Sequence, residues 1–170
     1  MAKIIFGIIL MVSASVLMAQ GMYKADLNGY NEVPTLSTTG SGQLAVKVSS
    51  DQRSLNVTLT FTKLEGVAQS VDLRLGMPGM TGGLLAWICG GLKPSCPTAA
   101  QGSATATITA NDIQAVPGQG IAAADLASVI LALENGAVYA HISTNKFQNG
   151  EIRGQLGRGN GGGNGRGRGN

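Results

Sequence analysis

The sequence predicts a mainly β protein, an antiparallel Greek-key β-sandwich of the immunoglobulin-like or superoxide-dismutase-like kind with one short helical crossover. Three observations predict it. Apolar and polar residues alternate along most of the chain, the alternating runs are short and separated by turn-forming residues, and one segment has helical periodicity. Residues 22–156 are long enough for a single domain that buries about two thirds of its unfolded surface.

Short alternating segments carry the strand prediction. In residues 43–48 and 54–61 every second side chain is apolar, which is typical of half-buried strands, and the polar run 49–54 joins them as a hairpin. Seven or eight strands are expected in all. Further strands are predicted at residues 70–76, 84–89, 103–110, 137–144 and 150–156.

The segment from Ala122 to Glu134 departs from this period and predicts a helix. Its apolar residues fall at i, i+3, i+4 and i+7, and Asn135-Gly136 is a stop signal. Asp125 is expected in the first turn, where the helix dipole favours an acid. The apolar face consists of Leu126, Val129, Ile130 and Leu133.

The two ends of the chain have the composition of segments outside the fold. Residues 1–21 resemble a secretory signal peptide, with Lys3 before an apolar run that is shorter than the roughly 20 residues needed to cross a bilayer. We therefore expect a secreted or periplasmic protein without a membrane span after cleavage. Residues 157–170 are rich in Gly, Asn and Arg and are predicted to form a disordered tail.

The charge of the body differs from the charge of the whole chain. Residues 22–156 carry eight Lys or Arg against nine Asp or Glu, so the net charge of +3 comes from the ends. A specific nucleic-acid surface on the body is therefore not expected. The arginines of the tail predict at most weak contact with anionic polymers.

Cys89 and Cys96 stand in the short run CGGLKPSC. In an exported chain such a pair most often forms a disulfide, and closing so short a loop stabilises by about 2.5 kcal/mol on the chain-entropy model. A metal site would need more ligands than two thiols, and the sequence offers no third cysteine. We predict a structural disulfide.

A catalytic site is hard to assemble from this sequence. His141 is the only histidine, and both cysteines belong to the predicted disulfide. Asp72 and Glu151 are the only acids in segments where paired-carboxylate chemistry is plausible. The sequence predicts no catalytic residue, no metal ligand and no cofactor.

Three stretches together resemble the CHRD domain, a module named for chordin and widespread in exported bacterial proteins. They are LNGYNEVPTLSTTGSG, LRLGMPGMTGGLLAWICGG and VYAHISTNKFQNGEIRGQL. The resemblance implies an extracellular β-sandwich-like module of poorly defined biochemical role. Its most specific part is a closing hairpin that contains Tyr139, His141, Ser143, Gly150, Glu151, Ile152, Arg153 and Gly154.

The chain departs from the family pattern at its histidines. Many members carry a His-x-His pair where this chain has Asp72-Leu73-Arg74, and a further histidine where it has Ser143. Imidazoles on alternate strand residues face the same way and can converge on copper or zinc. Arg74 cannot ligate a metal, and His141 lies two residues before the family position, so a metal is not expected here.

Strand parity predicts what replaces the histidines. If the strands around Asp72, Arg74, Glu151 and Arg153 are neighbours, two acids and two guanidiniums meet in an ion-pair patch, because Arg forks satisfy carboxylates bidentately. The alternative is that these are ordinary solvated strand charges.

The function predicted from these observations is that of a secreted, non-catalytic module with a structural, binding or matrix role. Its partner would be an extracellular protein or polysaccharide. Two alternatives stay open: a metal-binding, superoxide-dismutase-like enzyme, which the missing histidines disfavour, and tethering to anionic surface polymers by the cationic tail.

Overall fold

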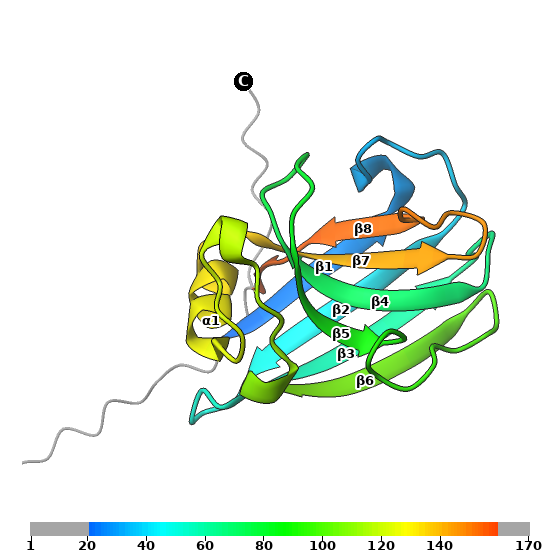
Figure 1. Ribbon diagram of the computed structural model, residues 1–170. Helices are drawn as coiled ribbons and strands as arrows, with labels where there is room; N and C mark the ends of the chain where they lie inside the picture. Colours follow the sequence, from blue (N-terminus) through cyan, green and yellow to red (C-terminus); the bar gives the residue numbers. More distant parts are fainter. Residues whose placement is uncertain (1–20, 160–170) are drawn as a thin grey trace, which may run out of the picture.

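The computed structural model describes residues 21–159, which form one antiparallel sheet, one α-helix and three short 3-10 helices (Figure 1). The strands are β1 Met22–Asn28, β2 Ser41–Val48, β3 Ser54–Thr62, β4 Ala68–Leu75, β5 Leu84–Cys89, β6 Gly102–Thr109, β7 Val138–Thr144, β8 Ile152–Gln155 and β9 Gly157–Arg158. The helices are η1 Gly29–Asn31, η2 Ala110–Asp112, η3 Pro117–Gln119 and α1 Leu126–Glu134.

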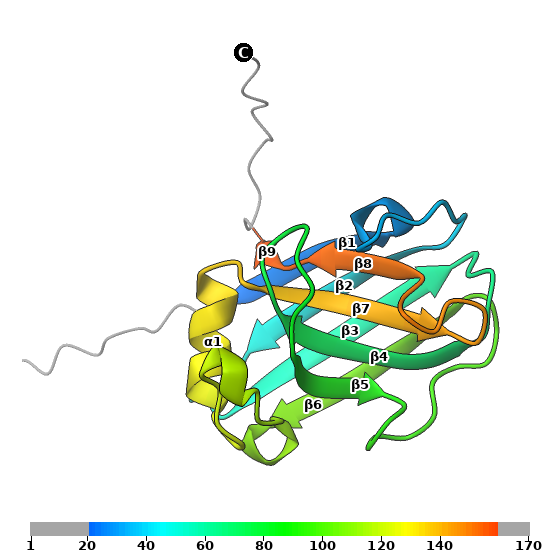
Figure 2. The ribbon, with the colours of Figure 1, turned by 45° about the horizontal axis from the view of Figure 1, so that its top comes forward.

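The strands follow the order β5-β4-β7-β8-β1-β2-β3-β6, and β9 pairs with β1. The sheet curls until its two edge strands approach each other, so that it forms a nearly closed barrel (Figure 2). Beyond β6 the chain also joins β5 directly, because Gln114 N–H donates to the Leu85 carbonyl at 2.8 Å. The mainly antiparallel β class is as predicted. The Greek-key sandwich of two sheets is not confirmed, because β1 pairs with both β2 and β8 and so joins all the strands into one sheet.

The core lies inside the curled sheet and follows the predicted alternation. In β2 and β3 every second side chain is buried, namely Leu44, Val46, Val48, Leu55, Val57, Leu59 and Phe61. Strand β1 was not predicted, although its buried residues Tyr23, Ala25 and Leu27 alternate in the same way. Strand β7 differs from all of these, because every one of its residues is buried.

Helix α1 lies across one end of the barrel (Figure 1) and buries all four residues of its predicted apolar face. It begins at Leu126, so the prediction that residues 122–125 are helical was wrong. The reason is local: Ala124 has φ +63°, a left-handed conformation that a right-handed helix cannot include. Asp125 is the N-cap, with its carboxylate accepting from Ser128 N–H at 3.0 Å.

The predicted disulfide is confirmed, since Cys89 at the end of β5 is bonded to Cys96. Two residues of the predicted tail belong to the sheet, because Arg158 pairs with Tyr23 and Gly157 with Lys24. Apart from Gly21 and Gly159, the predicted signal peptide at residues 1–21 and the rest of the predicted tail lie outside the described part of the chain. Within residues 21–159, no helix is long and apolar enough to cross a membrane.

Candidate functional site

The register of three neighbouring strands brings the motif residues of the sequence together. Across β4, β7 and β8, Asp72 pairs with His141 and His141 with Arg153. In the next rank on the same face, Arg74 pairs with Tyr139 and Tyr139 with Gln155. Two loops reach this face of β7, because Glu32 lies 4.0 Å from His141 and Gly82 N–H donates to the Tyr139 hydroxyl at 3.1 Å.

Asp72 and Arg74 form a close ion pair, with Arg74 Nε donating to Asp72 Oδ1 at 2.7 Å. The Asp72 side chain is buried, whereas 30% of the Arg74 side chain is exposed. Burial acts to lower the pKa of Arg74, but the adjacent Asp72 carboxylate outweighs it and raises that pKa above the ordinary value. Two of the four residues of the predicted patch, Asp72 and Arg74, therefore form one ion pair on strand β4.

Glu151 does not belong to this patch, which corrects the prediction. Its fully buried carboxylate accepts from Glu65 N–H at 2.6 Å, Gly66 N–H at 3.2 Å and the Thr38 hydroxyl at 3.0 Å. The alternation used for the prediction does not reach Glu151, because β8 begins at Ile152 and Gly150 has φ +127°. Glu151 instead joins the loops before β2 and after β3 to the start of β8.

Arg153 is also unpaired with any carboxylate, since no acidic oxygen lies within 4.0 Å of it in the described chain. Its guanidinium stacks on the Tyr139 ring at 3.5 Å from the centroid, and Nη2 donates to the Met77 carbonyl at 3.1 Å. Burial lowers the pKa of Arg153, although the guanidinium stays charged at any physiological pH. The four predicted residues thus form one ion pair and two separate buried charges.

His141 lies between two acids. Its Nε2 is 3.0 Å from the Asn149 carbonyl, which can only accept, so Nε2 carries a proton. Nδ1 is 3.6 Å from Asp72 Oδ1, and in the neutral ring its lone pair would face that carboxylate. Burial acts to lower the pKa of His141, but Asp72 and then Glu32 outweigh it, so the pKa is raised and the imidazolium is favoured.

Glu32 is a site residue that the sequence reasoning missed. Only 7% of it is exposed, its Oε1 has no hydrogen-bond partner, and the nearest cation is His141 Nε2 at 4.0 Å. Burial raises the pKa of Glu32, while His141 and Arg153 act to lower it. The sequence offered one signal for Glu32, its place in the NEVP stretch of the family resemblance. Because Glu32 lies in a loop, no alternation of side chains could predict which residues surround it.

Gly150 allows His141 and Glu32 to approach each other. A Cβ at this position would collide with His141 Nε2 and with Glu32 Oε1, and φ +127° is accessible mainly to glycine. The Asn-Gly step of the family-motif hairpin is therefore required by the site as well as by the turn.

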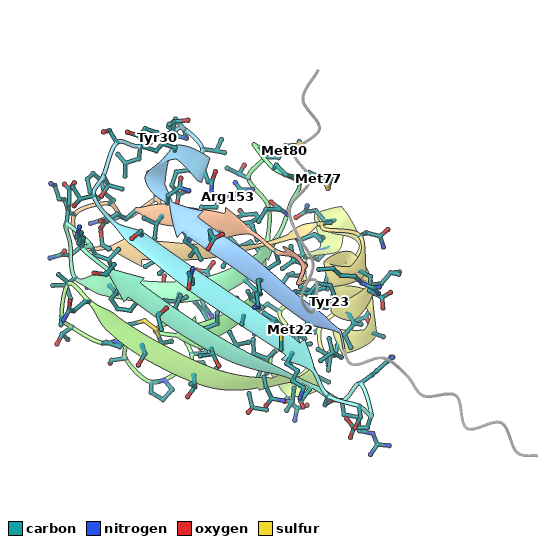
Figure 3. The ribbon with its side chains drawn as sticks, turned by 180° about the vertical axis from the view of Figure 1, so that it is seen from behind. Met22, Tyr23, Tyr30, Met77, Met80 and Arg153 are labelled. Atoms are coloured by element: carbon teal, nitrogen blue, oxygen red, sulfur yellow. A yellow bond between two sulfur atoms is a disulfide. The ribbon has the colours of Figure 1, made fainter. Side chains whose placement is uncertain are left out.

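A pocket of about 380 Å³ opens between the two loops, above Arg153. We call it the Glu32–Arg153 pocket; its lining residues are Tyr30, Asn31, Glu32, Val33, Pro34, Thr35, Pro78, Gly79, Arg153 and Gln155. Figure 3 shows Arg153 between Tyr30 on one side and Met77 and Met80 on the other. Tyr30, a lining residue, is 69% exposed, and Met77 and Met80, which flank the lining residues Pro78 and Gly79, are 51% and 61% exposed.

Gln155 lines the same pocket. Its Nε2 lies 2.8 to 3.0 Å from three backbone carbonyls, to which it donates, and these bonds hold the amide in one orientation. Its Oε1 is buried and has no partner. The pocket therefore contains a fixed guanidinium, whereas the unpartnered Oε1 atoms of Glu32 and Gln155 are buried behind its lining and closed to solvent.

Comparison with known proteins identifies the family. The model of the CHRD domain matches residues 23–156. The chain belongs to the CHRD family. Neither the curated proteins nor the solved structures include a match. The matched range contains every residue of the pocket, and it identifies the chain as a member of a family of generally non-enzymatic, extracellular binding modules.

The three positions at which many CHRD members were expected to carry histidine have other partners in this chain. Asp72 and Arg74 bond to each other, and Ser143 Oγ is 2.7 Å from Ser70 Oγ. Within residues 21–159, no three His, Cys, Asp or Glu side chains are grouped so that they could hold a metal ion. The absence of a metal site in this chain remains a prediction.

Proposed function

We propose that this CHRD protein is an exported, non-catalytic binding module that holds a small ligand in the Glu32–Arg153 pocket. The observation that carries the proposal is the presence of two buried, oppositely charged side chains in one pocket without an ion pair between them. A pocket of about 380 Å³ is within the size range of small-molecule sites.

The energetic argument rests on the cost of buried charge. A carboxylate or guanidinium taken out of water without a full set of partners destabilises the fold, so such groups are uncommon unless they serve a site. Arg153 makes one hydrogen bond, and Glu32 Oε1 makes none. A bound ligand would supply acceptors for the Arg153 guanidinium, whereas Glu32 Oε1 is buried against Gly150 and His141.

The lining residues support binding rather than catalysis. The described lining residues include no cysteine or histidine, and the nearby His141 has Nε2 engaged with the Asn149 carbonyl. The Tyr139 hydroxyl accepts from Gly82 N–H at 3.1 Å. No nucleophile with an adjacent general base faces the pocket in the described chain.

Native mass spectrometry tests the proposal directly. The mature protein is equilibrated with the small-molecule extract of its own extracellular medium, and retained ligands are identified. Thr35→Trp places a large side chain in the pocket, because Thr35 is an exposed lining residue. Thr105→Trp is the matched control, since Thr105 is exposed on β6 and lines no part of this pocket.

We expect a small molecule on the wild-type protein and on Thr105→Trp, and its loss from Thr35→Trp. No retained small molecule, or equal retention by Thr35→Trp, would contradict the proposal. Export of the protein is tested separately, by following the full-length chain into the extracellular fraction. Removal of residues 160–170 and comparison of surface retention tests whether the tail acts as a tether instead.

A further inference from the structure

We propose that the ligand of the Glu32–Arg153 pocket is a monocarboxylic acid with an apolar body, whose carboxylate accepts hydrogen bonds from the Arg153 guanidinium. This inference rests on the proposed function and names the chemical class of the ligand. It follows from the donors that Arg153 keeps open, from the balance of charge around it and from the residues that line the pocket.

Arg153 keeps hydrogen-bond donors open to the pocket. Only 2% of the residue is exposed, and its one hydrogen bond within residues 21–159 runs from Nη2 to the Met77 carbonyl at 3.1 Å. Nε and Nη1 have no partner in that part of the chain, yet neither atom is closed to solvent. Because Arg153 is a lining residue, these donors are within reach of a ligand in the pocket.

The guanidinium is held in the orientation that a planar acceptor needs. Its flat face lies on the Tyr139 ring at 3.5 Å from the centroid, so the plane of its N–H groups is fixed. The Met77 carbonyl takes one of the five N–H groups and leaves the others free. Adjacent N–H groups in one plane match the two oxygen atoms of a carboxylate through parallel hydrogen bonds.

The charges around Arg153 favour an anion. Arg74 Nε is bonded to Asp72 Oδ1 at 2.7 Å, and Glu32 Oε1 lies 4.0 Å from His141 Nε2. Burial acts to lower the pKa of His141, but Asp72 and Glu32 outweigh it, so the imidazolium is favoured and balances the Glu32 carboxylate. Arg153 is the cation of this group without an acid within 4.0 Å.

One negative charge therefore completes the site. A cationic ligand would add to the charge of Arg153 and would gain nothing from Glu32 Oε1, which is buried against Gly150 and His141. A dianion would place a second negative charge beside the Glu32 carboxylate. A monocarboxylate supplies one charge and two acceptor oxygens.

The lining favours an apolar body for the acid. Apart from Glu32 and Arg153 it contains no charged side chain, so a second charge on the ligand would find no partner there. Flat rings and branched side chains instead offer packing surfaces for hydrocarbon groups. The apolar lining residues are Tyr30, Val33, Pro34 and Pro78.

The first test compares acids with their amides on the full mature protein. Benzoate, phenylacetate and 4-methylpentanoate are titrated by calorimetry, each beside its carboxamide, which keeps the shape and lacks the charge. We expect at least one acid to bind with a Kd of about 1 mM or tighter, and its amide to bind at least about tenfold more weakly. Inorganic phosphate should also bind at least about tenfold more weakly than that acid, because it carries a second charge.

Variants locate the acid in the pocket. Arg153→Lys keeps the positive charge and loses the planar fork, so it should weaken binding by about tenfold or more. Arg158→Lys is the matched control, because Arg158 is exposed on β9 and lines no part of the pocket. Thr35→Trp should also abolish binding and Thr105→Trp should not, which locates the acid even if Arg153→Lys is poorly folded.

Glu32→Gln separates an acid from a ligand that pairs with Glu32. The change removes a negative charge from the lining, so the affinity for the acid should stay the same or rise. A ligand whose cationic group binds Glu32 would instead lose affinity. Glu134→Gln is the matched control, because Glu134 lies at the end of α1 and not in the pocket lining.

The outcomes distinguish this inference from the proposed function. If no acid binds, or if a carboxamide or phosphate binds as tightly as the acid, the carboxylate proposal is wrong. Binding that Thr35→Trp leaves intact, or that Glu32→Gln weakens by about tenfold, overturns it as well. If an extract ligand of another class is then lost from Thr35→Trp, the binding module stands and only its ligand class changes. If neither an added acid nor an extract ligand binds, both proposals fail.

Discussion

Glu151 and Glu32 are two acids of the family motifs with nearly the same burial and opposite surroundings. Glu151 is 0% exposed and its carboxylate accepts three hydrogen bonds from two loops. Glu32 is 7% exposed, and its Oε1 accepts none. The comparison teaches that burial alone does not assign a role to a charged residue. The partners do: the Glu151 carboxylate is held by three hydrogen bonds of the fold, whereas Glu32 Oε1 has none and lies 4.0 Å from His141 Nε2.

The largest effect is expected for Glu151→Ala. The change leaves the Glu65 and Gly66 amides and the Thr38 hydroxyl without their acceptor, so we expect a loss of about 3 kcal/mol in the free energy of unfolding. Urea unfolding measures it, with Glu134→Ala as the control. A loss below about 1 kcal/mol would mean that these bonds do not hold the loops, and the comparison with Glu32 would fail.

Arg74→Met comes next. It leaves the buried Asp72 carboxylate without its ion-pair partner, but 30% of the Arg74 side chain is exposed, so water screens part of the interaction. We expect a loss of about 1 to 2 kcal/mol by urea unfolding. The double variant Asp72→Asn with Arg74→Met should recover part of that loss. Unchanged stability of Arg74→Met would show that the pair is a surface contact only.

The pH dependence of stability should report the raised pKa of His141. Because the folded state holds this proton more tightly, the stabilisation is full below the unfolded value of 6.5 and is lost as pH rises through the folded pKa. The groups that face the ring are Asp72, Glu32 and the Asn149 carbonyl, with Arg74 bonded to Asp72 and Arg153 in the neighbouring register position.

Thermal unfolding between about pH 6 and pH 8 measures this effect. The wild-type melting temperature should fall across the range, and His141→Asn should remove most of that slope. The raised pKa of Glu32 acts in the same direction from its unfolded value of 4.5 upward. A wild-type slope that His141→Asn leaves intact would place the titration on another group.

The smallest effect on stability is expected for Glu32→Gln. Its Oε1 has no hydrogen bond to lose, and the amide removes the cost of a buried charge, so stability should stay within about 0.5 kcal/mol or rise. Urea unfolding of the ligand-free protein measures this. A loss as large as that of Glu151→Ala would show that both acids serve the fold.

Side-chain period made the strands predictable. Val46 and Val57 alternate with polar neighbours, so their burial followed from the sequence, and the spacing of Cys89 and Cys96 predicted their disulfide. The order of the strands could not be predicted in this way. Alternation of apolar and polar residues shows which face of a strand is buried, but it does not show which strands are neighbours. The pairing of β1 with β8, which turns the expected sandwich into one curled sheet, is such a case.

The site was harder to predict because backbone irregularities and loops build it. Gly150 breaks the alternation that assigned Glu151 to the face of Arg153. Ala124, with its positive φ, delays the helix beyond its apparent start. Glu32 lies in a loop, where no period gives it a neighbour. The family resemblance supplied the stretches that contain Glu32 and His141, but their proximity depends on tertiary structure.

The position of β1 between β2 and β8 has a consequence for the order of folding. Strand β1 can pair with β8 only after the end of the domain has been synthesised. A chain that emerges amino end first therefore cannot close the sheet before β8 is present. The pocket joins residues 30–35 to Arg153 and Gln155 and depends on the same closure. For a chain that crosses a membrane unfolded, the pocket would exist only after translocation is finished.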